Sequence, residues 1–272
     1  MTRRGKGRVT VKKKSVRIAA VGDIHCRKGN REYLRGLFAH MARAADCILL
    51  CGDLVHSGMV EEAAMLADEL SHEISIPIAG VLGNHDFELD RQDEIRRMLC
   101  DAGVSMLDGD IVELLGIRFA GIKGFGGGFG RYQLGAWGEP AIKHFVRESM
   151  DEALKLQSAL VKMEGMPCVV LMHYAPIRAT CEGEPLEVFP FLGSSHIEET
   201  INWFDVTAVF HAHAHNGSPE GRTQKGVTVY NVAMPLMHKL HPEHPPYRLV
   251  EIPRPGMQQE PTSRDFSRER GE

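Results

Sequence analysis

The sequence has no paired cysteines, no long apolar run and no strong excess of one charge. Its six cysteines form no C-x-x-C pair, and several lie in apolar runs such as CILLCGD and CVVLMH. This pattern is typical of reduced thiols in a cytoplasm. No apolar run reaches the ~18 residues of a membrane span, and the N-terminus lacks the apolar core of a secretory signal. The net charge of −4, with both signs mixed, favours neither nucleic acid nor membrane. We therefore expect a soluble cytoplasmic protein.

The 272 residues suffice for one large domain with short extensions. Residues 1–15 are basic, and we expect a solvated N-terminal tail; the alternative is a weak contact with an anion or nucleic acid. The main domain is predicted over residues 16–252. Residues 253–272 are polar and contain proline without periodicity, so we expect a disordered C-terminal tail.

Strand-like and helix-like patterns alternate along the first part of the chain. Apolar strands are predicted in VRIAAVGD, CILLCGD and IPIAGVLGNHD. A helix is predicted after each of them: the first ends at about Ala44, the second spans residues 60–73, and the third ends at Gly103. Such alternation predicts βαβ units around a mainly parallel sheet. Further on, we expect paired short strands in IVELLGIRFAGIKG, a long helix from about Glu139 to Lys162, and strands in PCVVLMHYAP, VTAVFHAHAH, VTVYNVAM and YRLVEIP. This order fits an α/β fold with two packed sheets and flanking helices.

Five of the predicted strands end in side chains that can bind metal ions. These side chains are Asp23 and His25, then Asp53, then Asn84 and His85, then His173, and finally His211, His213 and His215. One such ending would be an ordinary turn, but open α/β sheets place their sites at the carboxyl ends of strands. Mixed Asp, Asn and His suit divalent Zn, Mn, Fe or Ni. The sequence has no C-x-x-C pair and no H-E-x-x-H, which argues against structural zinc and the zinc protease helix.

The blocks GDIH, GD, GNHD, a single strand-end His and a terminal H-x-H occur in this order over residues 16 to about 252. They resemble the calcineurin-like metallophosphoesterase family. The resemblance implies a four-layer sandwich of two mixed β-sheets flanked by helices. It also implies two divalent ions and hydrolysis of small phosphomonoesters or phosphodiesters by attack of metal-bound hydroxide. The alternatives are a nuclease of the same fold, for which nucleic acid would be the partner, and a non-catalytic interaction scaffold.

The resemblance also implies roles for individual residues. Asp23 and His25 would bind the first ion, and Asp53 would bridge the two ions. Asn84 and His173 would bind the second ion. A bridging carboxylate is what holds two cations at ~3.5–4 Å from one another.

The last block, HAHAH, is ambiguous in register. It offers either His211 with His213 or His213 with His215, and neither pair is preceded by the glycine of the family pattern. All three side chains share one face of an extended strand, so periodicity does not choose among them. We expect His213 on the second ion and His215 on the first, because Ala212 then replaces the glycine with the smallest change. His211 would remain in the core or behind the ligands.

His85 is the candidate catalytic side chain, since it follows the predicted ligand Asn84 without itself being needed as a ligand. It could stabilise charge on the phosphoryl oxygens or protonate the leaving alkoxide. Several family members orient this histidine with an acid about three residues after the bridging aspartate, but here that position holds His56. We therefore name Asp86 as the nearest substitute.

Two cations are candidates for binding the phosphate. Arg27 follows the DIHC block, and Arg131 follows the glycine-rich loop GFGGGFG. This loop lacks both the GK[ST] ending of a P-loop and the GxGxxG pattern, which argues against nucleotide binding of that kind. The alternatives are a mobile lid over the metals and a plain flexible connection. The long helix with Glu148 and Glu152 is expected to present a solvated charged face.

Overall fold

The computed structural model describes residues 14–163 and 168–254. Residues 1–13 of the predicted N-terminal tail and residues 255–272 of the predicted C-terminal tail lie outside the described residues.

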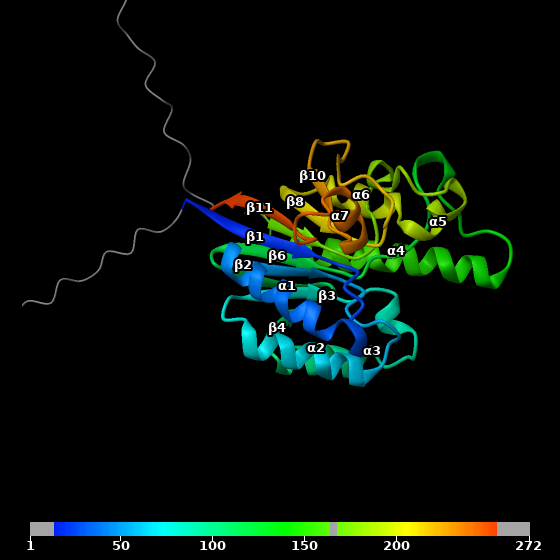
Figure 1. Cartoon of the computed structure of the whole chain (residues 1–272). Coiled ribbons are helices and arrows are strands. Elements are labelled where there is room, and N and C mark those ends of the chain that lie inside the picture. The colour runs from blue at the N-terminus through cyan, green and yellow to red at the C-terminus, as the bar shows by residue number, and fades with distance from the viewer. Residues whose placement is uncertain (1–13, 164–167, 255–272) are drawn as a thin grey trace, which may run out of the picture.

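The first sheet has five strands in the order β11-β1-β2-β3-β4 (Figure 1). Its strands are β1 (Ser15–Val21), β2 (Cys47–Cys51), β3 (Ile78–Val81), β4 (Val104–Met106) and β11 (Arg248–Pro253). Three helices connect the first four strands: α1 (Arg31–Ala44), α2 (Val60–Glu73) and α3 (Gln92–Asp101). These four strands are parallel, as the βαβ pattern predicts, and β11 joins β1 in the antiparallel direction.

The second sheet has six strands in the order β5-β6-β7-β8-β10-β9. Its strands are β5 (Asp110–Leu114), β6 (Ile117–Gly121), β7 (Cys168–Leu171), β8 (Val206–His211), β9 (Glu220–Arg222) and β10 (Thr228–Asn231). The other helices are α4 (Pro140–Val161), α5 (Phe189–Leu192), α6 (Ser195–Ile201) and α7 (Met234–Leu240). Short 3-10 turns are η1 (Lys28–Asn30), η2 (His85–Phe87), η3 (Gly130–Tyr132), η4 (Arg178–Cys181) and η5 (Leu186–Val188). The four inner strands are parallel, and β5 and β9 are antiparallel edges.

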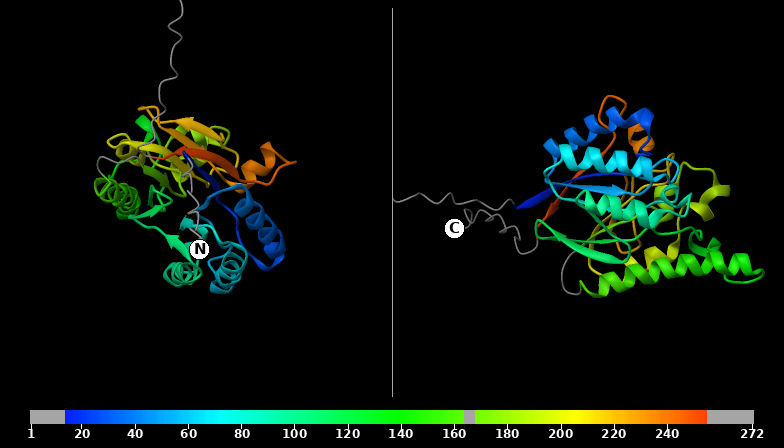
Figure 2. Two further views of the ribbon diagram at one scale, coloured as in Figure 1. Left: turned by 90° about the vertical axis from the view of Figure 1, so that its left-hand side faces the viewer. Right: turned by 90° about the horizontal axis from the view of Figure 1, so that it is seen from below.

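Alternation of side chains along the strands builds four layers. In β2, Ile48 and Leu50 pack against α1 and α2, whereas Leu49 packs against Phe119 and Phe210 of the second sheet. A third apolar cluster joins the second sheet to α4 and α6. Figure 2 shows the two sheets lying between these outer helices. The predicted four-layer α/β sandwich with two mixed sheets is therefore confirmed.

The long helix α4 differs from its predicted role. Glu152 was expected to be solvated, but its side chain is 1% exposed. Its carboxylate accepts a hydrogen bond from the backbone N–H of Gly124 at 2.7 Å and pairs with Lys155 at 2.7 Å. A buried carboxylate requires such partners, so this face of α4 is part of the packing.

Among the helices of the described ranges, none is both long enough and apolar enough to cross a bilayer.

Candidate metal centre

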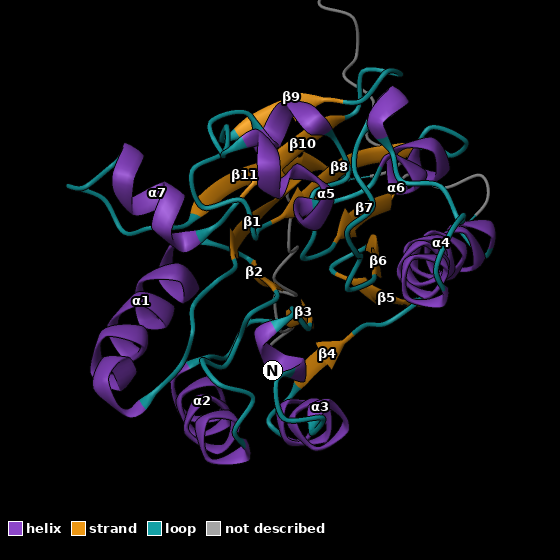
Figure 3. Cartoon of the chain, turned by 90° about the vertical axis from the view of Figure 1, so that its right-hand side faces the viewer, coloured by secondary structure: helices purple, strands orange, loops and turns teal. Residues whose placement is uncertain are grey.

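The candidate ligands follow the carboxyl ends of parallel strands from both sheets. Figure 3 looks at the side toward which these strand ends point. Asp23, Asp53 and Asn84 come after β1, β2 and β3 of the first sheet, and His173 and His213 come after β7 and β8 of the second. Because the two sheets pack face to face, their polar strand ends meet at one edge of the sandwich.

Four of the candidate ligands have a left-handed backbone conformation that residues other than glycine seldom adopt. Their φ values are 53° for Asp23, 43° for His25, 50° for Asp53 and 69° for His213. Such conformations cost ~1–3 kcal/mol each and gather at functional sites. The folded chain therefore accepts strain in order to direct these side chains toward one point.

Glycine residues make room beside two of the ligands. Gly52 has φ of 82°, and a Cβ atom there would lie 2.5 Å from Nδ1 of His173. A Cβ atom at Gly83 would lie 2.2 Å from Oδ1 of Asp53. The glycines of the GD and GNHD blocks are thus required because ligand side chains pass directly over them.

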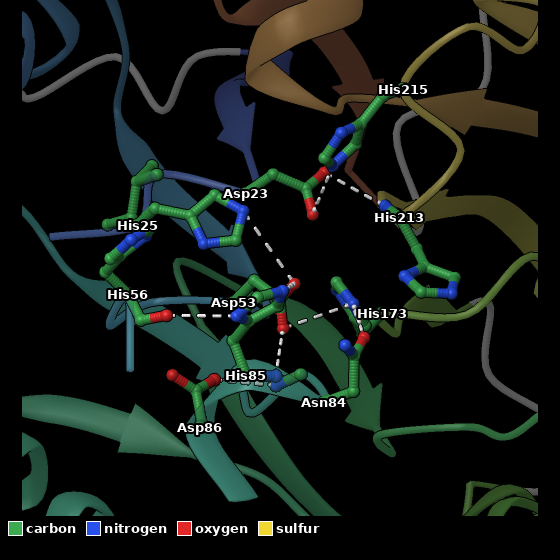
Figure 4. Close-up of polar contacts among 12 residues, drawn as sticks. Asp23, His25, Asp53, His56, Asn84, His85, Asp86, His173, His213 and His215 are labelled. Atoms are coloured by element: carbon green, nitrogen blue, oxygen red, sulfur yellow. Dashed lines mark hydrogen bonds and ion pairs between the residues drawn. The ribbon is translucent and has the colours of Figure 1, made fainter. Parts of the chain in front are cut away.

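The ligand atoms lie close enough together to share cations (Figure 4). Nε2 of His215 is 3.2 Å from Oδ1 of Asp23, and Nε2 of His173 is 3.3 Å from Oδ1 of Asp53 and 2.9 Å from Oδ1 of Asn84. Three sets have ligand atoms within 4.8 Å of one another: Asp23, His25 and His215; His25, Asp53 and His85; and Asp53, His173 and His213. The structure thus brings the seven predicted metal ligands to one place.

The HAHAH block separates its three histidines. His213 and His215 belong to the sets just described, whereas His211 is fully buried with Nδ1 at 2.8 Å from the carbonyl oxygen of Ala212. A Cβ atom at Gly22 would lie only 2.4 Å from the methyl carbon of Ala212. The alanine in place of the family's glycine is therefore accommodated because its neighbour across the fold is itself a glycine.

Burial keeps most of the histidines neutral. It lowers the pKa of His25 to about 4 and also lowers the pKa values of His173 and His213. In His215 the hydrogen bond with Asp23 outweighs burial and raises the pKa. Neutral imidazole is the form that binds a metal ion. Nδ1 of His173 lies 3.0 Å from the carbonyl oxygen of Cys51, so a proton held there leaves Nε2 as the ligand atom.

The two aspartates show that a cation fits here. Burial raises the pKa of Asp53, and the nearby charges of Asp23 and Asp86 raise it further. Burial also opposes ionisation of Asp23, but the hydrogen bond with His215 keeps its pKa well below the usual range. A divalent cation would favour the ionised form of both carboxylates, and the mixed Asp, Asn and His donors suit such an ion.

His85 lies beside the centre and is held by partners that the sequence did not predict. Its backbone N–H donates to Oδ1 of Asp53 at 2.8 Å, and Nδ1 of its ring is 2.9 Å from the carbonyl oxygen of His56 and 2.8 Å from Oε1 of Glu88. Nε2 is 4.0 Å from Oδ2 of Asp53. The signal that could have identified Glu88 is its spacing, three residues after His85 in the turn at η2.

Asp86 contacts backbone groups and not the ring of His85 that it was predicted to orient. Its buried carboxylate accepts hydrogen bonds from the backbone N–H groups of Leu54, Val55 and Gly83 at 2.7–3.2 Å. These bonds fasten the loop after β2 to the loop after β3. The prediction that Asp86 orients the ring of His85 is therefore wrong, because Glu88 and the His56 carbonyl contact that ring.

The two predicted phosphate-binding arginines lie in different surroundings. Arg27 is exposed, and its Nη1 lies 3.4 Å from Nε2 of His56, whose ring stacks on that of His85 with centroids 6.3 Å apart. Arg131 lines a separate cavity of about 490 Å³ with Arg178 and Phe189. Arg27 is thus at the rim of the centre, and Arg131 borders another hollow.

The glycine-rich loop before Arg131 is bonded to its neighbours. Gly127 donates to the carbonyl oxygen of Pro190 at 2.7 Å, and Gly128 donates to that of Gly193 at 2.9 Å. A Cβ atom at Gly126 would lie 2.5 Å from the Pro190 oxygen. These contacts pack the loop closely against the backbone of the segment that contains Pro190 and Gly193.

Comparison with known proteins agrees with this geometry. Residues 16–217 match the model of the calcineurin-like phosphoesterase family. The chain belongs to this family. Among solved structures, it is similar to phosphopantetheinyl hydrolase from Mycobacterium tuberculosis, with 15% identity, coverage of 92% of this chain and 99% of the other, and a TM-score of 0.61. It is also similar to TT1561 of Thermus thermophilus, with 17% identity, 88% and 99% coverage and a TM-score of 0.52.

A third similar structure is GAP50, described as the anchor in the inner membrane complex of Plasmodium, with 14% identity, 83% and 73% coverage and a TM-score of 0.51. At these identities the similarities show the shared fold. A sequence search of curated proteins returned no match.

Proposed function

We propose that this chain hydrolyses phosphomonoesters or phosphodiesters at a centre of two divalent ions. The observation that carries the proposal is the place of Asp53, whose Oδ2 lies 3.9 Å from Nε2 of His25 and whose Oδ1 lies 3.3 Å from Nε2 of His173. Asp23, His25 and His215 would hold the first ion together with Asp53. Asn84, His173 and His213 would hold the second ion with the same carboxylate.

When bound, two such ions lower the pKa of a shared water and neutralise charge on the phosphate oxygens. Imidazole ligands bind in their neutral form, so they leave most of the cation charge for the phosphate. The donors suit Mn, Fe, Zn or Ni, since the set mixes carboxylate, amide and imidazole.

His85 supplies the remaining chemistry in this proposal. The His56 carbonyl oxygen and the Glu88 carboxylate both accept from Nδ1, so this nitrogen carries a proton and Nε2 faces the centre near Asp53. When a second proton occupies Nε2, the imidazolium can donate that proton to the leaving alkoxide or a hydrogen bond to a phosphoryl oxygen. A general acid of this kind contributes ~10²–10⁴ in rate.

Turnover of 4-nitrophenyl phosphate and bis(4-nitrophenyl) phosphate tests the proposal. Protein loaded with Mn²⁺ should hydrolyse at least one of them, a chelator should abolish the rate, and Asp53→Asn should lose it. Asp101→Asn is the matched control, because Asp101 is exposed at the end of α3. Turnover that survives in Asp53→Asn would contradict the proposal.

The two other interpretations are distinguished by further outcomes. A metal-loaded protein that hydrolyses neither ester, and cleaves no oligonucleotide, would favour a non-catalytic scaffold. Cleavage of oligonucleotides with binding that weakens steeply as salt rises would favour a nuclease of the same fold.

A further inference from the structure

A cavity of about 470 Å³ adjoins the candidate metal centre. Two of its lining residues connect it with the ligands. Oδ1 of Asn84 lies 2.9 Å from Nε2 of His173, and the ring centroid of Tyr174 lies 4.5 Å from that of His213. A substrate whose phosphate lies at the centre can therefore extend its organic group into this cavity.

Four of the nine residues that line the cavity are Phe or Tyr, and the others include Glu148. Phe125 has its ring centroid 4.9 Å from that of Phe145 and 5.8 Å from that of Tyr174, and Phe87 also lines the space. Such rings offer flat apolar surfaces against which another ring can stack or meet edge to face. Phe125 belongs to the glycine-rich loop, whose Gly127 and Gly128 donate to the carbonyl oxygens of Pro190 and Gly193.

One cation lies among these rings. Nζ of Lys123 is 4.8 Å from the ring centroid of Phe125, 5.4 Å from that of Tyr174 and 5.5 Å from that of Phe87. An ammonium group has three N–H donors. Among the described residues, the single hydrogen bond from Nζ goes to the carbonyl oxygen of Gly124 at 2.8 Å. Lys123 therefore retains donors for an oxygen of a ligand in the cavity.

We propose that this space, the aromatic cavity, binds the organic group of the substrate, and that this group is an aromatic ring carrying an anionic oxygen that Lys123 recognises. The inference rests on the proposed phosphoesterase function and defines the class of substrate for it. The phosphate lies at the metal ligands, the ring lies against the surface formed by Phe125, Phe145 and Tyr174, and the anionic group meets the ammonium of Lys123.

Equilibrium binding of phosphonates tests the binding of the ring and the role of Lys123 independently of catalysis, because a phosphonate contains no ester bond to hydrolyse. Titration calorimetry on Mn²⁺-loaded protein compares 1-naphthylphosphonate with methylphosphonate, which present the same anion to the metals. The naphthyl compound should bind at least about tenfold more tightly, since it buries an apolar ring. Phe145→Ala should remove most of this preference. Trp203→Ala, which removes an exposed aromatic ring at the end of α6, should retain it.

A second comparison tests Lys123. The wild-type protein should bind 4-carboxyphenylphosphonate about tenfold more tightly than phenylphosphonate, because a charged donor meets the carboxylate. Lys123→Met should lose that preference while keeping the preference for naphthyl over methyl. Circular dichroism and thermal unfolding confirm that each variant is folded.

The outcomes keep this inference distinct from the proposed function. Hydrolysis of 4-nitrophenyl phosphate together with equal affinity for naphthyl and methyl phosphonates would overturn the aromatic cavity and leave the phosphoesterase. Equal affinity of the wild-type protein for the two phenyl compounds would overturn the role of Lys123. Absence of hydrolysis of every ester would overturn the proposed function, whatever the phosphonates show.

Discussion

Oδ1 of Asp53 lies 3.3 Å from Nε2 of His173, although Asp53 follows β2 of the first sheet and His173 follows β7 of the second. The candidate centre therefore connects the two halves of the sandwich. An ion bound between these residues would be lost when the sheets separate.

Metal binding should accordingly stabilise the fold. A ligand that binds only the folded state at a hundred times its Kd adds ~2.7 kcal/mol to the free energy of unfolding. We expect the Tm of Mn²⁺-loaded protein to exceed that of chelated protein by several degrees in differential scanning calorimetry. Asp53→Asn should show a much smaller increase. Equal Tm values for loaded and chelated wild-type protein would show that the ions do not join the sheets.

His85→Ala should retain the bound metals and lose most of the turnover. The ring acts beside the ions without being needed to hold them, so kcat should fall by ~10²–10⁴ while metal content stays at the wild-type value. His72→Ala, an exposed histidine of α2, is the control and should behave as wild type. Loss of metal from His85→Ala would mean that His85 is itself a ligand.

The next prediction distinguishes the metal-binding histidines of the HAHAH block from the histidine that does not bind metal. His213→Ala and His215→Ala should each lower metal content and abolish activity, because each removes a side chain from a ligand set. His211→Ala should keep both ions, since its ring bonds to the Ala212 carbonyl oxygen in the core. Metal analysis of the three variants checks this. Loss of metal from His211→Ala, together with full metal content and activity in His215→Ala, would show that the ligands are His211 and His213.

The sequence could predict the fold because its strands and helices are long, regular and ordered as βαβ units. Very short elements escaped prediction. Residues 104–106 of β4 and 220–222 of β9 have no periodicity of their own, and they are strands because β3 and β10 offer them open edges. Apart from Met234, helix α7 lies between the predicted strands VTVYNVAM and YRLVEIP, in a stretch for which no element was predicted.

The ligand positions were also visible in the sequence, because each stands where an apolar run ends. The partners of His85 and Asp86 were not, since they depend on how separate loops meet. Asp86 bonds to backbone groups of a loop more than thirty residues earlier. The aromatic cavity was missed for the same reason: Phe87, Lys123 and Phe145 come from three elements, and no local pattern links them.

Acid should weaken a pair of contacts far from the metals. Glu69 of α2 is 2% exposed and accepts from Nε of Arg35 at 2.6 Å and Nε of Arg31 at 2.5 Å. The hydrogen bond from Arg35 and then that from Arg31 lower its pKa from 4.5 to about 2. Because the folded state holds the carboxylate more acidic than the unfolded state does, its contribution is complete above pH 4.5 and declines as the pH falls toward 2.

Urea unfolding checks this contribution. Glu69→Gln should lower the free energy of unfolding by ~1–3 kcal/mol at pH 7, and the difference from wild type should narrow as the pH falls from 5 to 3. Glu243→Gln, in an exposed loop, should match wild type throughout. A difference that stays constant over this pH range would assign the loss to packing instead of charge.

The number of metal ions per chain tests the central claim most directly. Wild-type protein loaded with excess Mn²⁺ and then desalted should hold close to two ions per chain by elemental analysis, because the Asp53 carboxylate lies within 4 Å of a proposed histidine ligand of each ion, His25 and His173. Asp53→Asn, prepared in the same way, should hold fewer than one. A stable content of one ion in catalytically active wild-type protein would contradict the bridging carboxylate and the two-ion centre built on it.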